Sequence, residues 1–296
     1  MDTQNTSAAP IRKPAWLKVS LPQGQHWRSM SELIRRRGLH TVCDEASCPN
    51  KAECWGCGTA TFMLLGDVCT RGCRFCAVAT ARQGAPVNEA EPLELAEAVR
   101  ELKLRYAVLT SVDRDDLPDR GAGHFARCIA AIRELNPDAL IEALIPDFRG
   151  AEMDALLASP PDVLAHNVET VRRLQNVRDA RASFDISLAT LREAKGKGGL
   201  PTKSSLLLGL GEREDEVLSA MDELRSVGCD ILVMGQYLRP TASQVPVSEY
   251  LHPDVFARYA AFAKDKGFSS VIAGPLARTS YHAQEGHKAL GGRETP

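Results

Sequence analysis

Residues 203–238 read KSSLLLGLGEREDEVLSAMDELRSVGCDILVMGQYL. The runs 206–208 and 231–234 are apolar along their whole length, which is typical of strands that are covered on both faces. Between them, apolar residues recur at three- and four-residue spacing over 214–227, which predicts a helix that Gly228 would end. The stretch is therefore a strand–helix–strand unit with parallel strands.

The same alternation extends along most of the chain. Further helices are expected at 92–103, 124–135 and 253–266. The expected strands occupy 59–66, 106–112, 139–147, 163–168, 203–211, 231–238 and 269–273. Because such units connect by right-handed crossovers, the pattern predicts an α/β fold, a complete or partial (β/α) TIM-type barrel of about six parallel strands. A doubly wound open sheet is the alternative.

Composition and charge limit the class of protein. With 44% hydrophobic and 25% charged residues, the 296-residue chain is typical of soluble globular proteins. Its net charge of −2 gives no electrostatic reason to expect a nucleic-acid partner. Residues 1–14 lack the apolar core of a secretory signal, and no stretch is apolar enough to span a membrane. We therefore expect a cytoplasmic protein without a membrane partner.

The nine cysteines are unevenly distributed. Seven of them lie between Cys43 and Cys76. The reducing cytosol keeps thiols free, so metal binding is a better explanation than disulfides. Cys128 and Cys229 fall in apolar surroundings and are expected to be core thiols.

The sharpest signal is CTRGCRFC, residues 69–76, directly after the first predicted strand. Its cysteines, Cys69, Cys73 and Cys76, are called the loop cysteines below. A four-iron four-sulfur (4Fe–4S) cluster has four iron corners, so three thiolates on one loop leave one corner open for a substrate or cofactor. A zinc site or buried thiols are the alternative, but structural zinc sites favour C-x2-C pairs.

A second group of cysteines precedes the first predicted strand. Cys43, Cys48 and Cys54, the N-terminal cysteines, have C-x4-C-x5-C spacing. These wide gaps suit a second cluster on an irregular loop, and half of a zinc site is the alternative. Cys57 forms a C-x2-C pair with Cys54, and spacing leaves its role open.

The residues around both groups resemble the lipoyl synthase family of the radical S-adenosylmethionine (SAM) superfamily. The resemblance extends from about residue 14 to about residue 289. The matching stretches are CDEASCPNKAEC (43–54), GTATFM (58–63), CTRGCRFC (69–76), IPDF (145–148), HNVET (166–170), GLGE (209–212), QYLRP (236–240) and RTSYHA (278–283).

The resemblance implies two 4Fe–4S clusters and SAM as cofactors. The loop cysteines would hold the catalytic cluster, whose open iron binds SAM. The N-terminal cysteines would hold an auxiliary cluster that Ser280 completes. The implied reaction inserts two sulfur atoms from the auxiliary cluster at C6 and C8 of an octanoyl chain on a lysine of a lipoyl carrier domain. No base can ionise such C–H bonds, so radical abstraction is a reasonable route.

The glycine-rich SAM-binding element of many radical SAM enzymes is not evident, since strand 106–112 ends instead in TSVDRDD, residues 110–116. Candidate SAM contacts are therefore polar residues at strand ends, namely Thr110, Ser111, Glu142 and Asn167. Ordinary strand-end polar groups are the alternative. Arg278 could steady an anionic cluster or a substrate carbonyl, or form a surface salt bridge.

We expect four segments: a flexible tail at 1–14, an N-terminal extension with the auxiliary cysteines at 15–58, the barrel at 59–275, and a C-terminal extension with RTSYHA at 276–296. The expected partners are the octanoylated lipoyl carrier, a reductant such as ferredoxin or flavodoxin, and an iron-sulfur carrier that rebuilds the cluster. The alternative functions are biotin-type sulfur insertion, RNA methylthiolation, and a zinc-stabilised binding module without redox chemistry.

Overall fold

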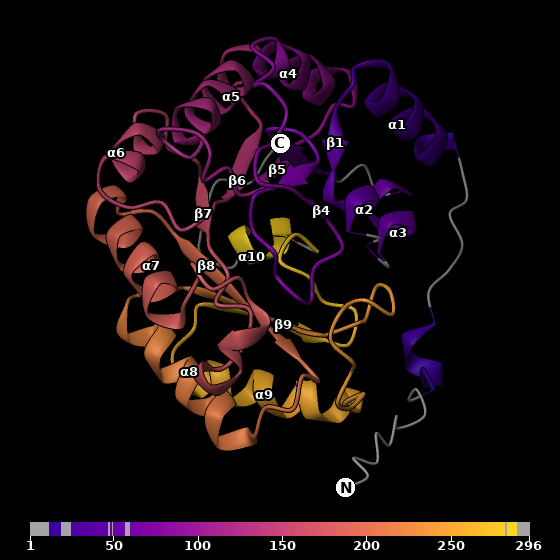
Figure 1. Ribbon diagram of the computed structural model, residues 1–296, viewed down its shortest axis with the longest axis vertical. Helices are drawn as coiled ribbons and strands as arrows, with labels where there is room; N and C mark the ends of the chain where they lie inside the picture. The colour runs from indigo at the N-terminus through magenta and orange to yellow at the C-terminus, as the bar shows by residue number, and fades with distance from the viewer. Residues whose placement is uncertain are drawn as a thin grey trace, which may run out of the picture.

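One curved sheet frames the protein, and helices line its outside (Figure 1). The structure is a computed structural model that describes residues 12–18, 25–46, 48, 50–56, 60–281 and 283–288. The strands in sheet order are β1 (His40–Thr41), β2 (Thr61–Leu64), β5 (Tyr106–Ser111), β6 (Leu140–Leu144), β7 (Val163–Ala165), β8 (Thr202–Leu208), β9 (Ile231–Gln236) and β10 (Ser270–Gly274). Every neighbouring pair from β2 onward is parallel, whereas β1 is antiparallel to β2.

The helices fall into an N-terminal group, a barrel group and one C-terminal helix. They are η1 (Ala15–Leu17), α1 (Gln25–Arg36), α2 (Val42–Glu45), α3 (Lys51–Gly56), α4 (Glu91–Glu101), α5 (Ala122–Leu135), α6 (Ala151–Leu157), η2 (Arg172–Val177), α7 (Phe184–Gly198), α8 (Glu214–Ser226), α9 (Pro253–Asp265) and α10 (Ala283–Lys288). Two short strands, β3 (Val68–Cys69) and β4 (Ala79–Thr80), pair apart from the main sheet. None of the helices in the described ranges combines the length and apolarity that crossing a bilayer requires.

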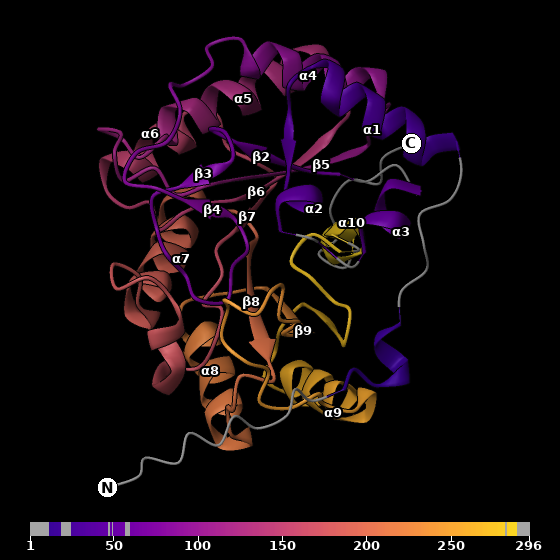
Figure 2. The same ribbon diagram turned by 45° about the vertical axis from the view of Figure 1, so that its right-hand side comes forward.

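The main sheet is a partial barrel. Helices α4 to α9 connect its successive parallel strands and lie on its outer face (Figures 1 and 2). Within the described part of the chain, no backbone ladder joins β10 to β1 or β2, so the ring is open there. The predicted partial TIM-type barrel is confirmed, with seven parallel strands where about six were expected. The doubly wound alternative does not fit, because these helices all cover one face.

The predicted elements agree with the structure where the periodicity is strong. Each predicted strand overlaps an observed one, and the four predicted helices are α4, α5, α8 and α9. Sequence periodicity does not predict α7, whose last turns carry glycines and lysines. Local capping sets its ends: Ser183 accepts a hydrogen bond from Ile186 N (3.1 Å), and Gly199 adopts a left-handed conformation with φ of +61°.

Two apolar cores lie between the sheet and the outer helices. The first includes Leu109 and Phe125 beneath α4 to α6, and the second includes Phe256 beneath α7 to α9. Each such side chain stabilises the fold by about 1.5–3 kcal/mol when fully buried. Cys128 belongs to the first core and Cys229 to the second, both fully buried, so the prediction that they are core thiols is confirmed.

After β10 the chain turns back into the barrel. Pro275 accepts a hydrogen bond from Gln236 N at the end of β9 (3.2 Å). The next residues pass so close to β9 that a Cβ on Gly235 would lie 2.0 Å from Ala277 O. A glycine at position 235 is therefore required for this path.

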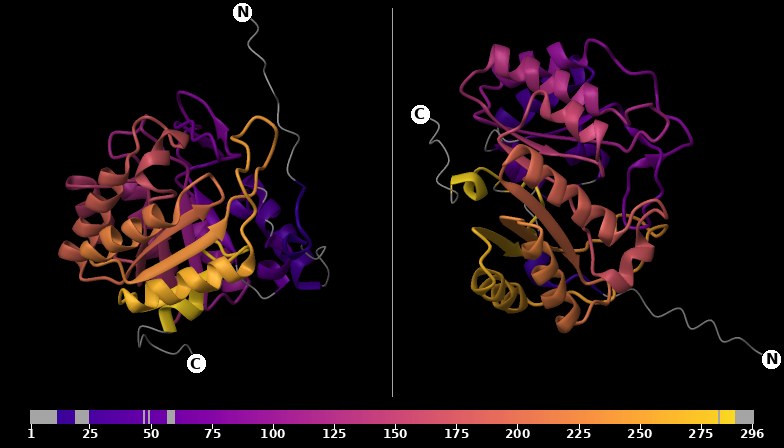
Figure 3. Two further views of the ribbon diagram at one scale, coloured as in Figure 1. Left: turned by 90° about the horizontal axis from the view of Figure 1, so that it is seen from below. Right: turned by 90° about the vertical axis from the view of Figure 1, so that its left-hand side faces the viewer.

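The same segment ends in α10, which lies near the middle of the ring in Figure 1. Ala283 of α10 is buried against Tyr106 and Leu140, the first residues of β5 and β6. Figure 3 accordingly shows α10 at the end of the barrel opposite to the loops that follow the strands. Residues 275–281 thus connect the two ends of the barrel.

Candidate active site

The loop cysteines lie at the carboxyl end of the barrel strands, on the loop that follows β2. Cys69 belongs to β3, and all three thiols are free and half-buried. The loop backbone is fixed from outside, since Thr70 N donates to Asp113 O (2.9 Å) and Arg74 N donates to Val177 O (2.7 Å). The loop cysteines therefore lie at the face of the barrel where the active sites of such barrels are found, as their place after the first predicted strand indicated.

Arg71, between the first two loop cysteines, anchors the loop in the protein. Its guanidinium is buried and contacts oxygens of Asp115 (2.8 Å), Asp147 (2.9 Å) and Asp113 (3.4 Å). Burial alone would raise the pKa of Asp147, but the hydrogen bond and charge of Arg71 outweigh it and hold that pKa at about 2. Burial outweighs Arg71 at Asp113, whose pKa is raised. Arg71 therefore holds three aspartates against the loop, of which Asp147 is buried and the other two are half-buried.

A second clamp holds the start of the loop. Leu65, the residue after β2, has a left-handed backbone with φ of +67°, which costs about 1–3 kcal/mol for a residue of this kind. Glu91 accepts a hydrogen bond from Leu65 N (3.1 Å), and Arg114 donates one to Leu65 O (3.2 Å). His124 in turn binds the Glu91 carboxylate. These buried contacts compensate for the strain and direct the chain into the loop.

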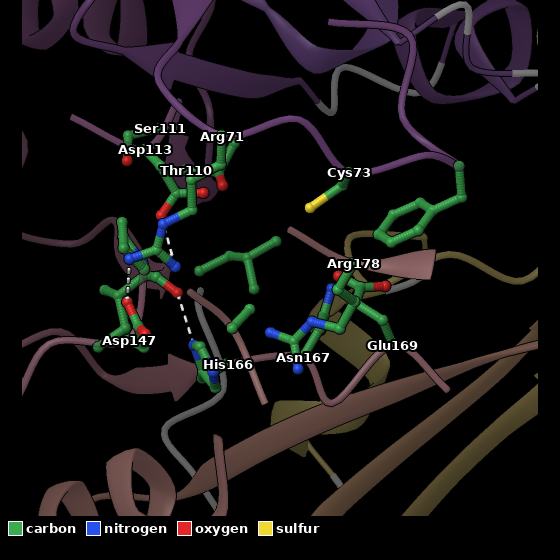
Figure 4. A pocket seen from close by; sticks show the side chains of 15 residues that line it. Arg71, Cys73, Thr110, Ser111, Asp113, Asp147, His166, Asn167, Glu169 and Arg178 are labelled. Atoms are coloured by element: carbon green, nitrogen blue, oxygen red, sulfur yellow. Dashed lines mark hydrogen bonds and ion pairs between the residues drawn. The ribbon is translucent and has the colours of Figure 1, made fainter. Parts of the chain in front are cut away.

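A cavity of about 150 Å³ opens beside Cys73 (Figure 4). Its lining is mostly polar, with carboxylates, cations and hydroxyls drawn from several strand ends. The polar lining residues are Arg71, Thr110, Ser111, Asp113, Asp147, His166, Asn167, Glu169 and Arg178. The arrangement suits a charged ligand that reaches the loop cysteines.

Three of the four predicted SAM contacts meet at this cavity. Thr110 and Ser111 line it from the end of β5, and Asn167 lines it from the loop after β7. Glu142 does not line the cavity. Its carboxylate is fully buried and binds Lys203 Nζ (2.9 Å) and Tyr106 Oη (2.8 Å).

The position of Glu142 along β6 explains why it is separate. Alternate residues of a strand face the same side, so Glu142 points as Leu144 does, and Leu144 lines the cavity. Glu142 lies two residues earlier, which is roughly 6–7 Å deeper in the barrel. We therefore leave Glu142 out of the proposed SAM contacts.

His166, Glu169 and Arg178 are cavity residues that sequence reasoning missed as ligand contacts. Burial lowers the pKa of His166 to about 4, and its ring nitrogens contact Ile145 O (2.9 Å) and Ser187 Oγ (2.9 Å). A neutral, hydrogen-bonded histidine supports the cavity wall. The signal that could have found His166 and Glu169 was the HNVET stretch at the end of a predicted strand, whereas Arg178 lies outside any such motif.

The N-terminal cysteines lie on and between two short helices beside the open edge of the barrel. Cys43 is buried in α2, Cys54 is half-buried in α3, and Cys48 lies half-buried between them. Burial, and then the charge of Cys48, raise the pKa of Cys43 to about 11. Cys57 lies outside the described residues.

The C-terminal segment packs against these helices. Asn50 Nδ2 donates to Leu276 O (2.6 Å), and Tyr281 Oη donates to Glu53 Oε1 (2.9 Å). Ser280 is half-buried and lies between these two anchor points in the sequence. The structure thus brings the segment of Ser280 to the N-terminal cysteines across more than two hundred residues of sequence.

Arg278 is half-buried on the same segment. Its Nη1 donates to Ala277 O (2.7 Å), and no carboxylate of the described residues lies within ion-pair distance of it. Burial lowers the pKa of Arg278, and the nearby charge of Cys48 opposes this shift. The surface salt bridge considered above is therefore not found in the described part of the chain.

The donor set fits two iron-sulfur clusters. Each group offers three free thiols on a short segment, and thiolates are the usual donors to cluster iron. The loop group borders a polar cavity that can receive a ligand for the remaining iron corner. Because burial raises the pKa of Cys69 to about 11 and that of Cys73 to about 12, iron must displace protons when it binds.

Comparison with known proteins decides the family. Residues 63–224 match the radical SAM superfamily, and residues 2–48 match the N-terminal domain of lipoyl synthase. The chain is 52% identical to the lipoyl synthase of Thermus thermophilus over 92% of this chain and 85% of that protein. It is 51% identical to that of Methylococcus capsulatus, over 96% of this chain and 89% of that protein. The chain belongs to the lipoyl synthase family.

Solved structures agree with this membership at the level of fold. The hydrogenase maturase HydG from Carboxydothermus hydrogenoformans superposes with a TM-score of 0.58 at 14% identity, covering 77% of this chain and 65% of that one. Methylornithine synthase (PylB) gives 0.55 at 15% identity, covering 71% and 69%. As a member of the lipoyl synthase family, the chain is a radical SAM enzyme that uses SAM and 4Fe–4S clusters.

Proposed function

We propose that this protein inserts two sulfur atoms at C6 and C8 of an octanoyl chain attached to a lysine of a lipoyl carrier domain. The observation that carries the proposal is the pairing of two free-thiol groups with the RTSYHA segment in a chain of this family. One thiol group borders the polar cavity, and the other borders the segment of Ser280.

We assign the loop cysteines to the SAM-binding cluster. The support is their spacing, their half-buried free thiols and the cavity beside Cys73. When bound, SAM and this cluster supply hydrogen-atom abstraction, which no side chain provides. Thr110, Ser111 and Asn167 offer hydroxyl and amide groups to the ligand, while Arg71 keeps the loop in place.

We assign the N-terminal cysteines and Ser280 to the auxiliary cluster. Residues 15–58 and 276–296 would then act together as two extensions that meet beside the barrel of residues 59–275. The hydrogen bonds of Asn50 and Glu53 to the C-terminal segment support this assignment. A hydroxyl is a poorer ligand than a thiolate for such iron, so the corner at Ser280 would be released more easily. That property suits a cluster that gives up its sulfur.

The chemistry also defines the partners. Reductive cleavage of SAM needs an electron, so we infer a reductant protein such as ferredoxin or flavodoxin. Sulfur that leaves with the product must be replaced, so we infer an iron-sulfur carrier. The substrate would be the octanoylated lipoyl carrier in the cytoplasm, and the net charge of −2 favours no nucleic-acid partner.

Mass spectrometry of an octanoyl-lysyl peptide, incubated anaerobically with loaded protein, SAM and reductant, tests the proposal. We expect two sulfur atoms to be gained. Cys73→Ala should abolish SAM cleavage, whereas Cys48→Ala should retain cleavage without sulfur insertion. Cys229→Ala, which alters a buried core thiol, is the matched control. Sulfurated product from Cys48→Ala would refute the donor role of the auxiliary site.

A further inference from the structure

Thr279 lies at the junction of the two proposed sites. Its hydroxyl oxygen is 3.3 Å from Asn167 Oδ1 and 3.1 Å from Ser205 Oγ. Asn167 lines the cavity beside the loop cysteines (Figure 4), and Ser280 directly follows Thr279 in the chain. One side chain therefore connects the cavity wall to the segment of the auxiliary site.

The residues that Thr279 contacts belong to the cavity wall itself. Asn167 also hydrogen-bonds the carboxylate of Glu169, another lining residue. The amide oxygen can only accept and the amide nitrogen can only donate, so Asn167 accepts from Thr279 and donates to Glu169. The polar chain runs without a break from Thr279 to the cavity.

The backbone at Glu169 is held by the same strand. Glu169 has φ of +65°, a left-handed conformation that non-glycine residues rarely adopt. Glu169 N donates to Ser205 O (3.1 Å), and Leu207 N donates to Glu169 O (2.7 Å), which fixes it against β8. Ser205 thus contacts Glu169 through its backbone and Thr279 through its side chain.

The other contacts of the segment run in a different direction. Leu276 O accepts a hydrogen bond from Asn50, and Tyr281 donates one to Glu53, and both partners belong to the N-terminal extension. Thr279 instead hydrogen-bonds the segment to the barrel wall.

We infer that Thr279 is a positioning residue that couples the segment of Ser280 to Asn167, so that the geometry of the auxiliary site follows that of the SAM cavity. The inference rests on the proposed function, because it takes Ser280 as a ligand of the auxiliary site. A shift of Asn167 on ligand binding is passed to Ser280 through one hydroxyl. The coupling keeps the auxiliary site, which donates the sulfur, correctly positioned relative to the reacting carbon of the substrate.

The test compares three variants of the loaded protein. Thr279→Val keeps the shape and removes the hydroxyl, and Thr279→Ser restores the hydroxyl. Thr190→Val is the matched control, because Thr190 is fully buried on α7 and its hydroxyl bonds only to Ile186 O of its own helix (3.1 Å) among the contacts described. The two measurements are the amount of SAM cleaved per sulfur inserted, and SAM-dependent hydrogen–deuterium exchange of peptides covering residues 275–281.

A misplaced donor should uncouple the reaction. We expect Thr279→Val to raise the SAM cleaved per sulfur inserted about 10-fold to 100-fold, as sub-ångström to ångström misplacement does in other enzymes. It should also abolish the protection that SAM confers on residues 275–281 in the parent protein. Thr279→Ser and Thr190→Val should behave like the parent in both measurements.

Separate outcomes refute the inference and the proposed function. The inference would be overturned if Thr279→Val had the same ratio of SAM cleaved to sulfur inserted, and the same protection of residues 275–281, as the parent protein. It would also be overturned if Thr279→Ser lost as much of both as Thr279→Val does. A parent protein that cleaves SAM without inserting sulfur would instead refute the proposed function. If Thr279→Val does not fold, Thr279→Ala provides the same comparison, because it also removes the hydroxyl that contacts Asn167.

Discussion

The two cysteine groups are held in the protein in different ways. The loop cysteines lie on a segment fixed by buried charges, with Arg71 against three aspartates and a second clamp at Leu65. The N-terminal cysteines lie on two short helices and the turn between them, and hydrogen bonds of Asn50 and Glu53 join this region to the C-terminal segment. The first arrangement suits a site that lasts through many turnovers. The second suits a site that is taken apart and rebuilt.

Replacing Arg71 should have the largest effect on stability, because it removes the centre of the ion-pair network that holds the loop cysteines. Arg71→Met removes the buried cation that three aspartates share, and although Arg120 still pairs with Asp147 and Arg181 with Asp115, Asp113 loses its ion pair. This should lower the free energy of unfolding by up to about 3–5 kcal/mol. SAM cleavage should be lost as well. Denaturant unfolding and 5′-deoxyadenosine assays measure the two effects.

Arg173→Met is the control for Arg71. Arg173 pairs with Glu216 on the surface, so its loss should leave the free energy of unfolding close to that of the parent protein. Equal effects of the two substitutions would show that the Arg71 network does not stabilise the loop in the way described.

Acid should lower the stability of the protein through His166, which lines the cavity. Burial lowers the pKa of His166 to about 4, whereas in the unfolded chain it is near 6.5. As the pH falls below about 6.5, the unfolded chain takes up the proton first. Stability should therefore fall by up to ~3 kcal/mol between pH 6.5 and 4, with full stability retained above that range.

His166→Asn removes this titration and retains a donor for Ile145 O. Its stability should depend less steeply on pH between 6.5 and 4 when unfolding is measured across that range. A slope equal to that of the parent protein would show that other groups cause the acid sensitivity.

A substitution at Gly235 should disturb the C-terminal segment beside the N-terminal cysteines and leave the loop cysteines in place. Gly235→Ala places a Cβ 2.0 Å from Ala277 O, so the C-terminal segment must move. We expect a loss of about 1–3 kcal/mol in stability, with SAM cleavage retained and sulfur insertion lost. Product analysis by mass spectrometry distinguishes the two steps.

Gly196→Ala is the matched control, because a Cβ there meets no atom within 4 Å and lies in α7. It should leave both steps unchanged and stabilise the helix by roughly 0.5–1 kcal/mol. Retained sulfur insertion in Gly235→Ala would show that the path of residues 275–281 is not needed by the auxiliary site.

Arg278 should have the smallest effect, on retention of the auxiliary iron. Its cation lies near Cys48 without a carboxylate partner in the described residues, so an anionic cluster is its natural counter-charge. Arg278→Gln should release auxiliary iron to a chelator about tenfold faster, equivalent to ~1.4 kcal/mol. Arg278→Lys, which keeps the charge, should release iron at a rate close to that of the parent protein. Identical rates in the parent and both variants would show that Arg278 does not retain the auxiliary iron.

Local patterns in the sequence were enough to predict the barrel class and the thiol groups. Strand and helix periodicities depend on neighbours along the chain, and so does the spacing of the loop cysteines. Prediction gave no bounds where the local pattern is weak, as in α7, and it failed where depth along a strand matters. Glu142 and Leu144 face the same side of β6, but only Leu144 reaches the cavity.

The sequence by itself therefore determined which chemistry the chain carries, because cysteine spacing and family motifs are properties of adjacent residues. The tertiary structure decided how that chemistry is held. The Arg71 network joins the ends of different strands, and the Thr279 contacts join positions 279, 167 and 205. Such pairings depend on strand order and on the return of the chain through the barrel, which no local pattern specifies.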